Sequence, residues 1–527
     1  MLDVGEQSRL RAVLAAAWTR DPRLGVGLIT VSALVTILVA FTGPSPVALT
    51  LGPRTSMLPP WYLPVSMSGL SEWVVVPLLW LGLAVGALGL WIAWRAVGAG
   101  WRPNNRKLFA LGAGLSTLTA LVPPLTSADV LMYAAYGRLQ ILGLDPYDIT
   151  PATIFREQFD PVLIWTERPW QDTPSVYGPV ASASQWLAAW LGGPNMHDIV
   201  FWLQMLALIP FLVIGALVVK MAHADHLVQT RAVLFTVLNP IMIWSVIAGA
   251  HNEAFTLVFA VVGLWFLRKH PFVAGLGIGL AGTIKVSLVF YGIAMAWGYR
   301  RDWRKLVGLV LGAAVPLAIA YGLWVPRALF AAGRNTGYIS AGSWAPPFFT
   351  ALSWVMPDYI ARSIIGWVGW AGMIAIAWML SRVMPWRPVP GADPSVDPTR
   401  EPLTVAVRTA AILTASWLIT SPYTLSWYDL TTWVPLALLA ASRLDVLMMW
   451  RGLWLSVAYV TGRSVQFSDA MQATAFVVRD VLCSGAQIVV IVVIVRWWWR
   501  EGHPLPSLTL WQQRWHAMRH AKLPSAD

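Results

Sequence analysis

Long apolar runs with almost no charge dominate this chain and restrict what it can fold into. Runs such as 25–43 and 73–94 match the roughly 20 residues that a helix needs to cross a hydrocarbon core of about 30 Å. The runs are continuous rather than alternating, which favours helices over a transmembrane barrel. With 57% hydrophobic and 12% charged residues, the chain is too apolar for a soluble globule. We therefore predict an all-α polytopic membrane protein.

The spacing of the apolar runs predicts about 12 to 14 transmembrane helices together with short re-entrant helices. Candidate spans lie near 25–43, 73–94, 108–124, 199–219, 231–250, 253–267, 306–325, 361–381, 403–420, 428–441, 445–460 and 479–496. The run 271–298 has basic residues at both ends and is too short for two full crossings at about 1.5 Å per residue. It is predicted to form two short helices, with Lys285 at their midpoint.

The charge pattern indicates how the chain lies across the membrane. The net charge is +12, but the basic residues gather in links between spans, as cytoplasmic segments do. The charge therefore reports orientation and does not indicate a nucleic-acid partner. Both termini are predicted to be cytoplasmic, 125–198 is predicted to be an outer loop, 386–402 a cytoplasmic linker, and 497–527 a basic cytoplasmic tail. The whole chain, 1–527, is expected to be one integral membrane domain.

The segment 126–151 carries the most promising polar side chains. Asp129 precedes a helical pattern on which Tyr133 and Tyr136 fall on the same face, while Arg138 lies about half a turn away. A carboxylate beside tyrosines at a membrane surface suits a general base acting on a sugar hydroxyl. The alternative is that Asp129 only caps the helix, as the neighbouring Ser127 also could.

A second polar cluster, at His251, Asn252 and Glu253, lies at a tight turn between two apolar runs. These side chains suit hydrogen bonds to sugar hydroxyls. One histidine and one carboxylate, without a metal-binding spacing such as HExxH or DxD, do not indicate a divalent metal site. The single cysteine, Cys483, lies in an apolar run and offers neither a disulfide nor a cysteine-ligated metal.

Three basic residues are candidates for binding a phosphate. Lys285 lies among apolar residues, where an unpaired charge is costly, and it either binds a lipid phosphate or extends to the interface. Arg334 and Arg463 lie beside glycines and hydroxyls in predicted outer loops. Tyr177, in the loop sequence VYGPV, and Tyr428, in SPYTLSWYDL, are further candidates for substrate contact.

Five motifs together resemble a known family. They are SADVLMYAAYGRLQILGLDPY, TPSVYGP, GAHNEAF, AGTIKVS and SPYTLSWYDL. In this order they resemble the polyprenol-phosphate-mannose-dependent alpha-(1→6)-mannosyltransferases, multi-spanning GT-C glycosyltransferases of lipomannan and lipoarabinomannan synthesis in actinobacterial envelopes. The resemblance covers roughly residues 105 to 430. In GAHNEAF the family pattern leads us to expect an aspartate where Glu253 stands.

The resemblance implies a plasma-membrane enzyme with its active site on the outer, periplasmic face. Asp129 would take the proton of an acceptor 6-hydroxyl as mannose passes, with inversion, from polyprenyl-phosphate-mannose to a lipid-anchored mannan. Lys285, Arg334 and Arg463 would be the candidates for the donor phosphate. No nucleotide is required, which fits the lack of a nucleotide-binding motif.

Other functions fit parts of the pattern. A GT-C enzyme using polyprenyl-phospho-arabinose would share the same framework, and a non-catalytic envelope scaffold would not need the Asp129 face. A lipid or polysaccharide transporter would also need many spans, but it would often show internal repeats. No such repeat is evident in the sequence, whereas carboxylates and tyrosines accumulate in one outer loop, which favours catalysis at the surface.

Overall fold

The computed structural model describes residues 18–63, 70–331, 333, 337–393, 395–463 and 467–501. Every regular element in these ranges is a helix and none is a strand, which confirms the all-α prediction. Eight helical segments of the described chain are long and apolar enough to cross a membrane: Pro22–Phe41, Glu72–Gly98, Met196–Met221, His226–Ala248, Trp303–Trp324, Asp358–Val383, Pro402–Thr420 and Asp469–Glu501. The predicted span 253–267 forms a shorter helix, Glu253–Phe266, and Pro271–Gly282 is one of the short helices predicted within 271–298.

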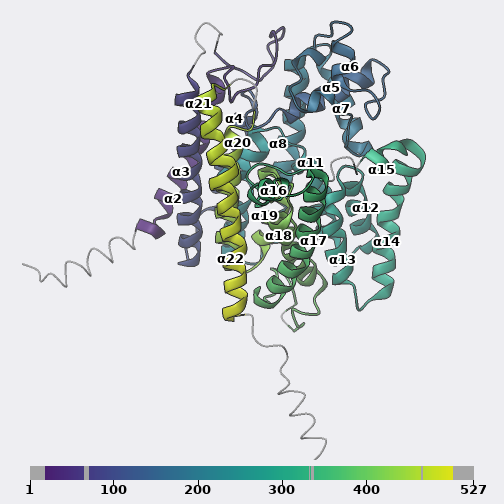
Figure 1. Cartoon of the computed structure of the whole chain (residues 1–527). Coiled ribbons are helices and arrows are strands. Elements are labelled where there is room, and N and C mark those ends of the chain that lie inside the picture. Colours follow the sequence, from purple (N-terminus) through teal and green to yellow (C-terminus); the bar gives the residue numbers. More distant parts are fainter. Residues whose placement is uncertain are drawn as a thin grey trace, which may run out of the picture.

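The helices form a bundle with a smaller helical group at one end (Figure 1). One side holds α2 (Pro22–Phe41), α3 (Glu72–Gly98), α20 (Arg443–Val460), α21 (Asp469–Phe476) and α22 (Ser484–Glu501), and the other holds α12 (Pro271–Gly282), α13 (Val289–Gly298) and α14 (Trp303–Leu317). Between them stand α17 (Asp358–Val383) and α18 (Pro402–Thr420), and α18 packs on both α13 and α17. The end group consists of α5 (Asp129–Ile141), α6 (Pro151–Phe155) and α7 (Pro179–Gly192).

Further helices complete the bundle. They are α4 (Asn105–Ala120), α8 (Met196–Met221), α9 (His226–Phe235), α10 (Pro240–Met242), η5 (Ile243–Ala248), α11 (Glu253–Phe266), η7 (Ala318–Trp324), α15 (Arg327–Ala331), α16 (Pro346–Ser353) and α19 (Leu430–Leu438). Short 3-10 turns are η1 (Trp18–Arg20), η3 (Leu163–Trp165), η4 (Trp170–Asp172), η6 (Val286–Leu288) and η8 (Ser426–Asp429), and η9 (Val477–Cys483) joins α21 to α22. Local sequence fixes several of the starts. Asn104 and Asn195, for example, accept backbone hydrogen bonds with their side chains at the first turns of α4 and α8.

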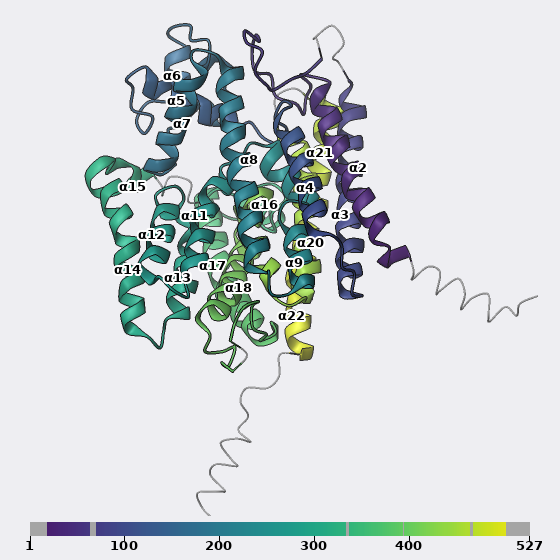
Figure 2. The same ribbon diagram turned by 180° about the vertical axis from the view of Figure 1, so that it is seen from behind.

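The two ends of the described chain lie on the side of the bundle away from α5–α7. Both views place the start of α2 and the end of α22 there (Figures 1 and 2). The sequence predicted the termini and the loop 125–198 on opposite sides of the membrane, and the positions of α2, α22 and α5–α7 agree with this. That the side with the chain ends faces the cytoplasm stays a prediction. The link 386–402 is tied to the same bundle, because Arg268 pairs with Glu401 at 2.9 Å and Arg300 donates to the carbonyl oxygen of Thr399 at 2.8 Å.

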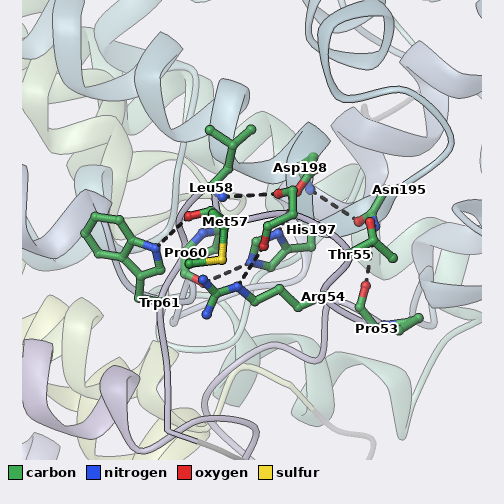
Figure 3. A network of polar contacts seen from close by, with 11 residues as sticks. Pro53, Arg54, Thr55, Met57, Leu58, Pro60, Trp61, Asn195, His197 and Asp198 are labelled. Carbon is green, nitrogen blue, oxygen red and sulfur yellow. Dashed lines mark hydrogen bonds and ion pairs between the residues drawn. The ribbon is translucent and has the colours of Figure 1, made fainter.

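The segment between α2 and α3 is fastened to the start of α8 by polar contacts (Figure 3). The ring of His197 lies between the Asp198 carboxylate, 2.8 Å from Nδ1, and the Pro60 carbonyl oxygen, 2.9 Å from Nε2. Asp198 also accepts from the Ser56 hydroxyl at 2.7 Å. These bonds hold 53–61 beside the end group and away from its cavity.

The region 271–298 is broken as predicted. α12 ends at Gly282 and η6 begins at Val286, with Lys285 in extended conformation between them. The loop before α7 closes this break, since the amides of Gly178 and Val180 donate to the carbonyl oxygens of Ile284 and Thr283 at 3.1 and 3.2 Å. Only glycine fits at 178, because a Cβ there would lie 2.1 Å from the Thr283 oxygen.

Candidate functional site

A cavity of about 400 Å³ lies where the end group meets the bundle. Its wall combines α5, the loop before α7, the break after α12, and the facing parts of α17 and α18. Among the described residues, one carboxylate and two cations line it, from Asp129, Lys285 and Arg362. Aromatic side chains form much of the remaining wall: Tyr136, Trp170, Tyr177, Tyr321, Tyr338, Trp370, Trp417, Tyr423, Trp427 and Tyr428. A carboxylate, cations and aromatic faces in one hollow are typical of a site for a polar, ring-bearing ligand.

Asp129 faces this cavity and does not cap its helix. It is the first residue of α5, whose N-cap position, Ala128, makes no side-chain capping bond. The backbone amide of Asp129 donates to the Ser127 hydroxyl at 3.2 Å, so Ser127 supplies the local hydrogen bond. The Asp129 side chain keeps 20% of its surface exposed. Burial raises the pKa of this carboxyl to about 6, against the opposing charge of Lys285, which suits a general base near neutral pH.

The predicted helical face of α5 is present, but its two tyrosines differ. Tyr136 lines the cavity and donates its hydroxyl to the Thr173 carbonyl oxygen at 2.8 Å. Tyr133 lies behind the wall, 2% exposed, with its ring edge-on to Tyr177 at 5.2 Å. Of the three, Tyr136 and Tyr177 can touch a ligand, and Tyr133 supports them.

Lys285 is held at the cavity by an internal partner. Its ammonium forms an ion pair with the buried carboxylate of Glu253 and lies 5.0 Å from the ring centre of Tyr428 and 5.9 Å from that of Tyr177. The sequence allowed two alternatives for Lys285, binding a lipid phosphate or extending to the membrane interface. In the structure its ammonium pairs with Glu253 and does not extend to the interface. Lys285 still lines the cavity and is placed to meet an anion there.

The turn at 251–253 lies behind the cavity wall, which corrects the expectation that it contacts a sugar directly. His251 is fully buried and stacks on Trp427 with ring centres 3.6 Å apart. Glu253 is 3% exposed and faces Lys285. Asn252 is not among the residues that line the cavity. His251 therefore supports the cavity wall through Asp129 and Trp427, and Glu253 supports it through Lys285.

Of the other predicted cations, Arg463 is described and does not line the cavity. Arg463 is 6% exposed, pairs with Glu167, and donates to the Ala48 carbonyl oxygen at 2.8 Å. The structure thus places Arg463 away from the cavity and beside Glu167, unlike Lys285. Arg334 lies outside the described residues. Arg138 points away, as predicted, and pairs with Asp160 at 2.9 Å.

Arg362 is a site residue that sequence reasoning missed. It lies near the start of α17, lines the cavity, and stacks over the Phe349 ring at 4.6 Å. It also donates to the Gly337 carbonyl oxygen at 3.3 Å. The signal was a lone arginine at the start of the predicted span 361–381, where a charge is unusual.

Comparison with known proteins places part of this site, the part that carries Asp129 and Lys285, within one family model. The model described as "Alpha-(1→6)-mannopyranosyltransferase, N-terminal domain" matches residues 13–301, a range that includes Asp129, His251, Glu253 and Lys285.

Three curated relatives are similar over parts of their length. A probable alpha-(1→6)-mannopyranosyltransferase of Mycolicibacterium smegmatis is 26% identical over 312 residues, covering 56% of this chain and 52% of the relative. Alpha-(1→6)-mannopyranosyltransferases A and B of Corynebacterium glutamicum are 29% and 25% identical, covering 38% and 47% of this chain and 45% and 44% of the relatives. The chain thus spans about half the length of the curated relatives it matches. No solved structure matches it significantly.

Proposed function

The chain belongs to the alpha-(1→6)-mannopyranosyltransferase family, and we propose on that premise that it is a membrane-bound mannosyltransferase. Its donor would be polyprenyl-phosphate-mannose, and its acceptor the 6-hydroxyl of a lipid-anchored mannan of the lipomannan and lipoarabinomannan type. The observation that carries the proposal is the meeting of Asp129 with Lys285 and Arg362 in one cavity walled by aromatic rings.

Each of these groups has a role in the proposed transfer. The acceptor oxygen attacks C1 of the donor mannose while Asp129 takes the hydroxyl proton. The bond between C1 and the phosphate oxygen breaks, and the polyprenyl phosphate leaves with the electron pair. Lys285 and Arg362 stabilise the charge on that phosphate. Attack opposite the leaving group inverts a beta-linked donor to an alpha-(1→6) product.

The aromatic wall supports a sugar ligand. Tyr136, Tyr177 and Tyr428 combine apolar faces with hydroxyl groups, and such rings pack against the apolar face of a sugar while their edges remain polar. The lipid tail of the donor would require access from the membrane, which agrees with a cavity partly walled by α17 and α18. The proposed location is the outer face of the plasma membrane, with both termini cytoplasmic.

The proposal is tested with the purified full chain in lipid nanodiscs. Labelled polyprenyl-phosphate-mannose and a short alpha-(1→6)-mannoside acceptor are incubated with wild type, Asp129→Asn and the control Asp148→Asn. Asp148 lies in the same outer segment but is exposed and pairs with Arg327. We expect wild type and the control to form an alpha-(1→6) product and Asp129→Asn to lose at least a hundredfold in rate.

The possible results separate the parts of the proposal. Product from polyprenyl-phospho-arabinose alone would overturn the donor assignment, and a beta-linked product would overturn inversion. Equal rates for wild type and Asp129→Asn would remove Asp129 as the base. Absence of transfer from either donor, with folded protein, would overturn the enzymatic assignment.

A further inference from the structure

The ring of His251 is held in one orientation next to Asp129. It is fully buried and stacks on Trp427 at an interplanar angle of 13°. Its Nδ1 atom lies 3.7 Å from Oδ2 of Asp129, within about 1 Å of hydrogen-bond distance. Nδ1 has no hydrogen-bond partner among the described residues, so Asp129 is the acceptor it faces.

The backbone around this contact is strained on both sides. Thr126 has φ 76° and Ala250 has φ 52°, and they are the two non-glycine residues with positive φ in the part of the chain that the structure describes. One precedes Asp129 by three positions and the other precedes His251 directly. Unfavourable backbone conformations persist where the surrounding structure fixes a functional geometry. A Cβ at Gly249 would lie 2.3 Å from the His251 ring, so the approach also needs a glycine there.

Two hydroxyl groups lie at the other nitrogen of the ring. Nε2 of His251 lies 3.4 Å from the Thr126 hydroxyl and 3.5 Å from that of Ser127. Burial and the positive charge of Lys285 hold the pKa of His251 well below its usual range, so the ring is neutral near pH 7. Hydroxyls can donate or accept, whereas a carboxylate only accepts, so a neutral ring that faces Asp129 through Nδ1 carries its hydrogen on that atom and accepts at Nε2.

We infer that His251 is a positioning residue that donates its Nδ1 hydrogen to the Asp129 carboxylate and fixes the direction in which that base takes the acceptor proton. The inference rests on the proposed function, because it assigns Asp129 the role of base. This role explains how the turn after η5 can affect the reaction although it is buried and does not line the cavity. Stacking on Trp427 and the hydroxyls of Thr126 and Ser127 near Nε2 together keep Nδ1 directed at Asp129.

A hydrogen bond from Nδ1 favours the charged carboxylate. Removing it therefore raises the pH at which Asp129 becomes protonated. The other titratable or charged groups that act on this carboxyl are Lys285, which opposes protonation, and Glu253, which favours it. Five tyrosines also lie close enough to interact with it electrostatically: Tyr133, Tyr177, Tyr423, Tyr428 and Tyr459. All seven groups are kept in a His251 variant, so the change in midpoint isolates the histidine.

Two substitutions separate hydrogen bonding from packing. His251→Phe keeps a ring to stack on Trp427 but has no donor, whereas His251→Asn keeps an N–H close to the position of Nδ1 but loses the stack. We expect His251→Phe to raise the protonation midpoint of Asp129 by about one pH unit and to lower kcat about tenfold with little change in acceptor KM. His251→Asn should leave the midpoint near that of wild type and retain most of kcat.

The midpoint is measured without substrate, by infrared titration of the carboxyl band that disappears in Asp129→Asn. An unchanged midpoint in His251→Phe overturns the inference. Equal losses of kcat in both variants without movement of either midpoint would also overturn it, because they indicate packing alone. A raised midpoint in His251→Phe in a protein that transfers no mannose would support the contact and count against the proposed function instead.

Discussion

Replacing Asp129 by asparagine is expected to stabilise the protein while it removes activity. The charged carboxylate is held in the cavity against the effect of burial, which raises its pKa from 3.8 to about 6. A rise of about two pH units, at about 1.4 kcal/mol each, corresponds to about 3 kcal/mol at neutral pH. Since 20% of the side chain is exposed, solvent reduces this figure, and we expect a gain of between about 1 and 3 kcal/mol. Asparagine has nearly the same shape and carries no charge.

The sign of the pH dependence distinguishes this effect from a change in packing. Because the folded-state pKa lies above the ordinary value, the folded protein binds the proton more tightly than the unfolded chain does. The stability gained by asparagine is therefore complete above about pH 6 and is lost as the pH falls from about 6 toward 3.8. At pH 5 roughly half of it should remain.

Unfolding can be followed directly, because the single cysteine of the chain, Cys483, is fully buried in the folded protein. A thiol-reactive fluorophore then reports unfolding from one position, and wild type is compared with Asp129→Asn at pH 7.5 and pH 5. The exposed control Asp148→Asn should unfold as wild type does. An Asp129→Asn variant that is no more stable than wild type at pH 7.5, or whose advantage is the same at both values, would refute the charge argument.

Four further outcomes are expected. The rate of mannosyl transfer should fall as the pH drops through about 6, because the pKa of Asp129 is raised to that value and the base must be unprotonated; a rate unchanged down to pH 5 would contradict this. Arg362→Gln should raise donor KM about tenfold, whereas Arg463→Gln, which breaks a buried pair, should lower the unfolding temperature and leave donor KM unchanged; the reverse pattern would restore Arg463 as the phosphate ligand. Gly366 lines the cavity with open space at its Cβ position. The side chain in Gly366→Leu should therefore occupy part of the cavity and raise the KM for substrate without loss of stability, as checked by the cysteine assay. Gly249→Ala should destabilise the protein by about 1 to 3 kcal/mol, since its Cβ would meet the His251 ring; wild-type stability would show that the ring can move.

Local sequence was enough to predict some parts of the site. The helical period placed Asp129 and Tyr136 on one face of α5, and basic residues at both ends of 271–298 indicated the break at Lys285. These predictions depend on neighbours within a few turns, where helix geometry fixes the relation between side chains.

Contacts between distant segments could not be read in the same way. Lys285 and Glu253 are 32 positions apart, and the sequence suggested each as a substrate ligand because nothing local shows that they pair. His251 meets Trp427 only through the packing of different helices. Arg463 looked free beside glycines, yet its partner Glu167 is 296 positions away. Tertiary packing decides whether a buried charge faces a ligand or another side chain.

The bonds from Gly178 and Val180 to the carbonyl oxygens of the broken helix have a consequence for folding. The break leaves carbonyl groups that no helical amide can reach, and the loop before α7 supplies the missing donors. Neither segment can detach without leaving unpaired polar groups in both, so the two should open as one cooperative unit. The amides of Gly178 and Val180 should then exchange with solvent deuterium at a common, slow rate, and a ligand that bridges Tyr177 and Lys285 should slow both together.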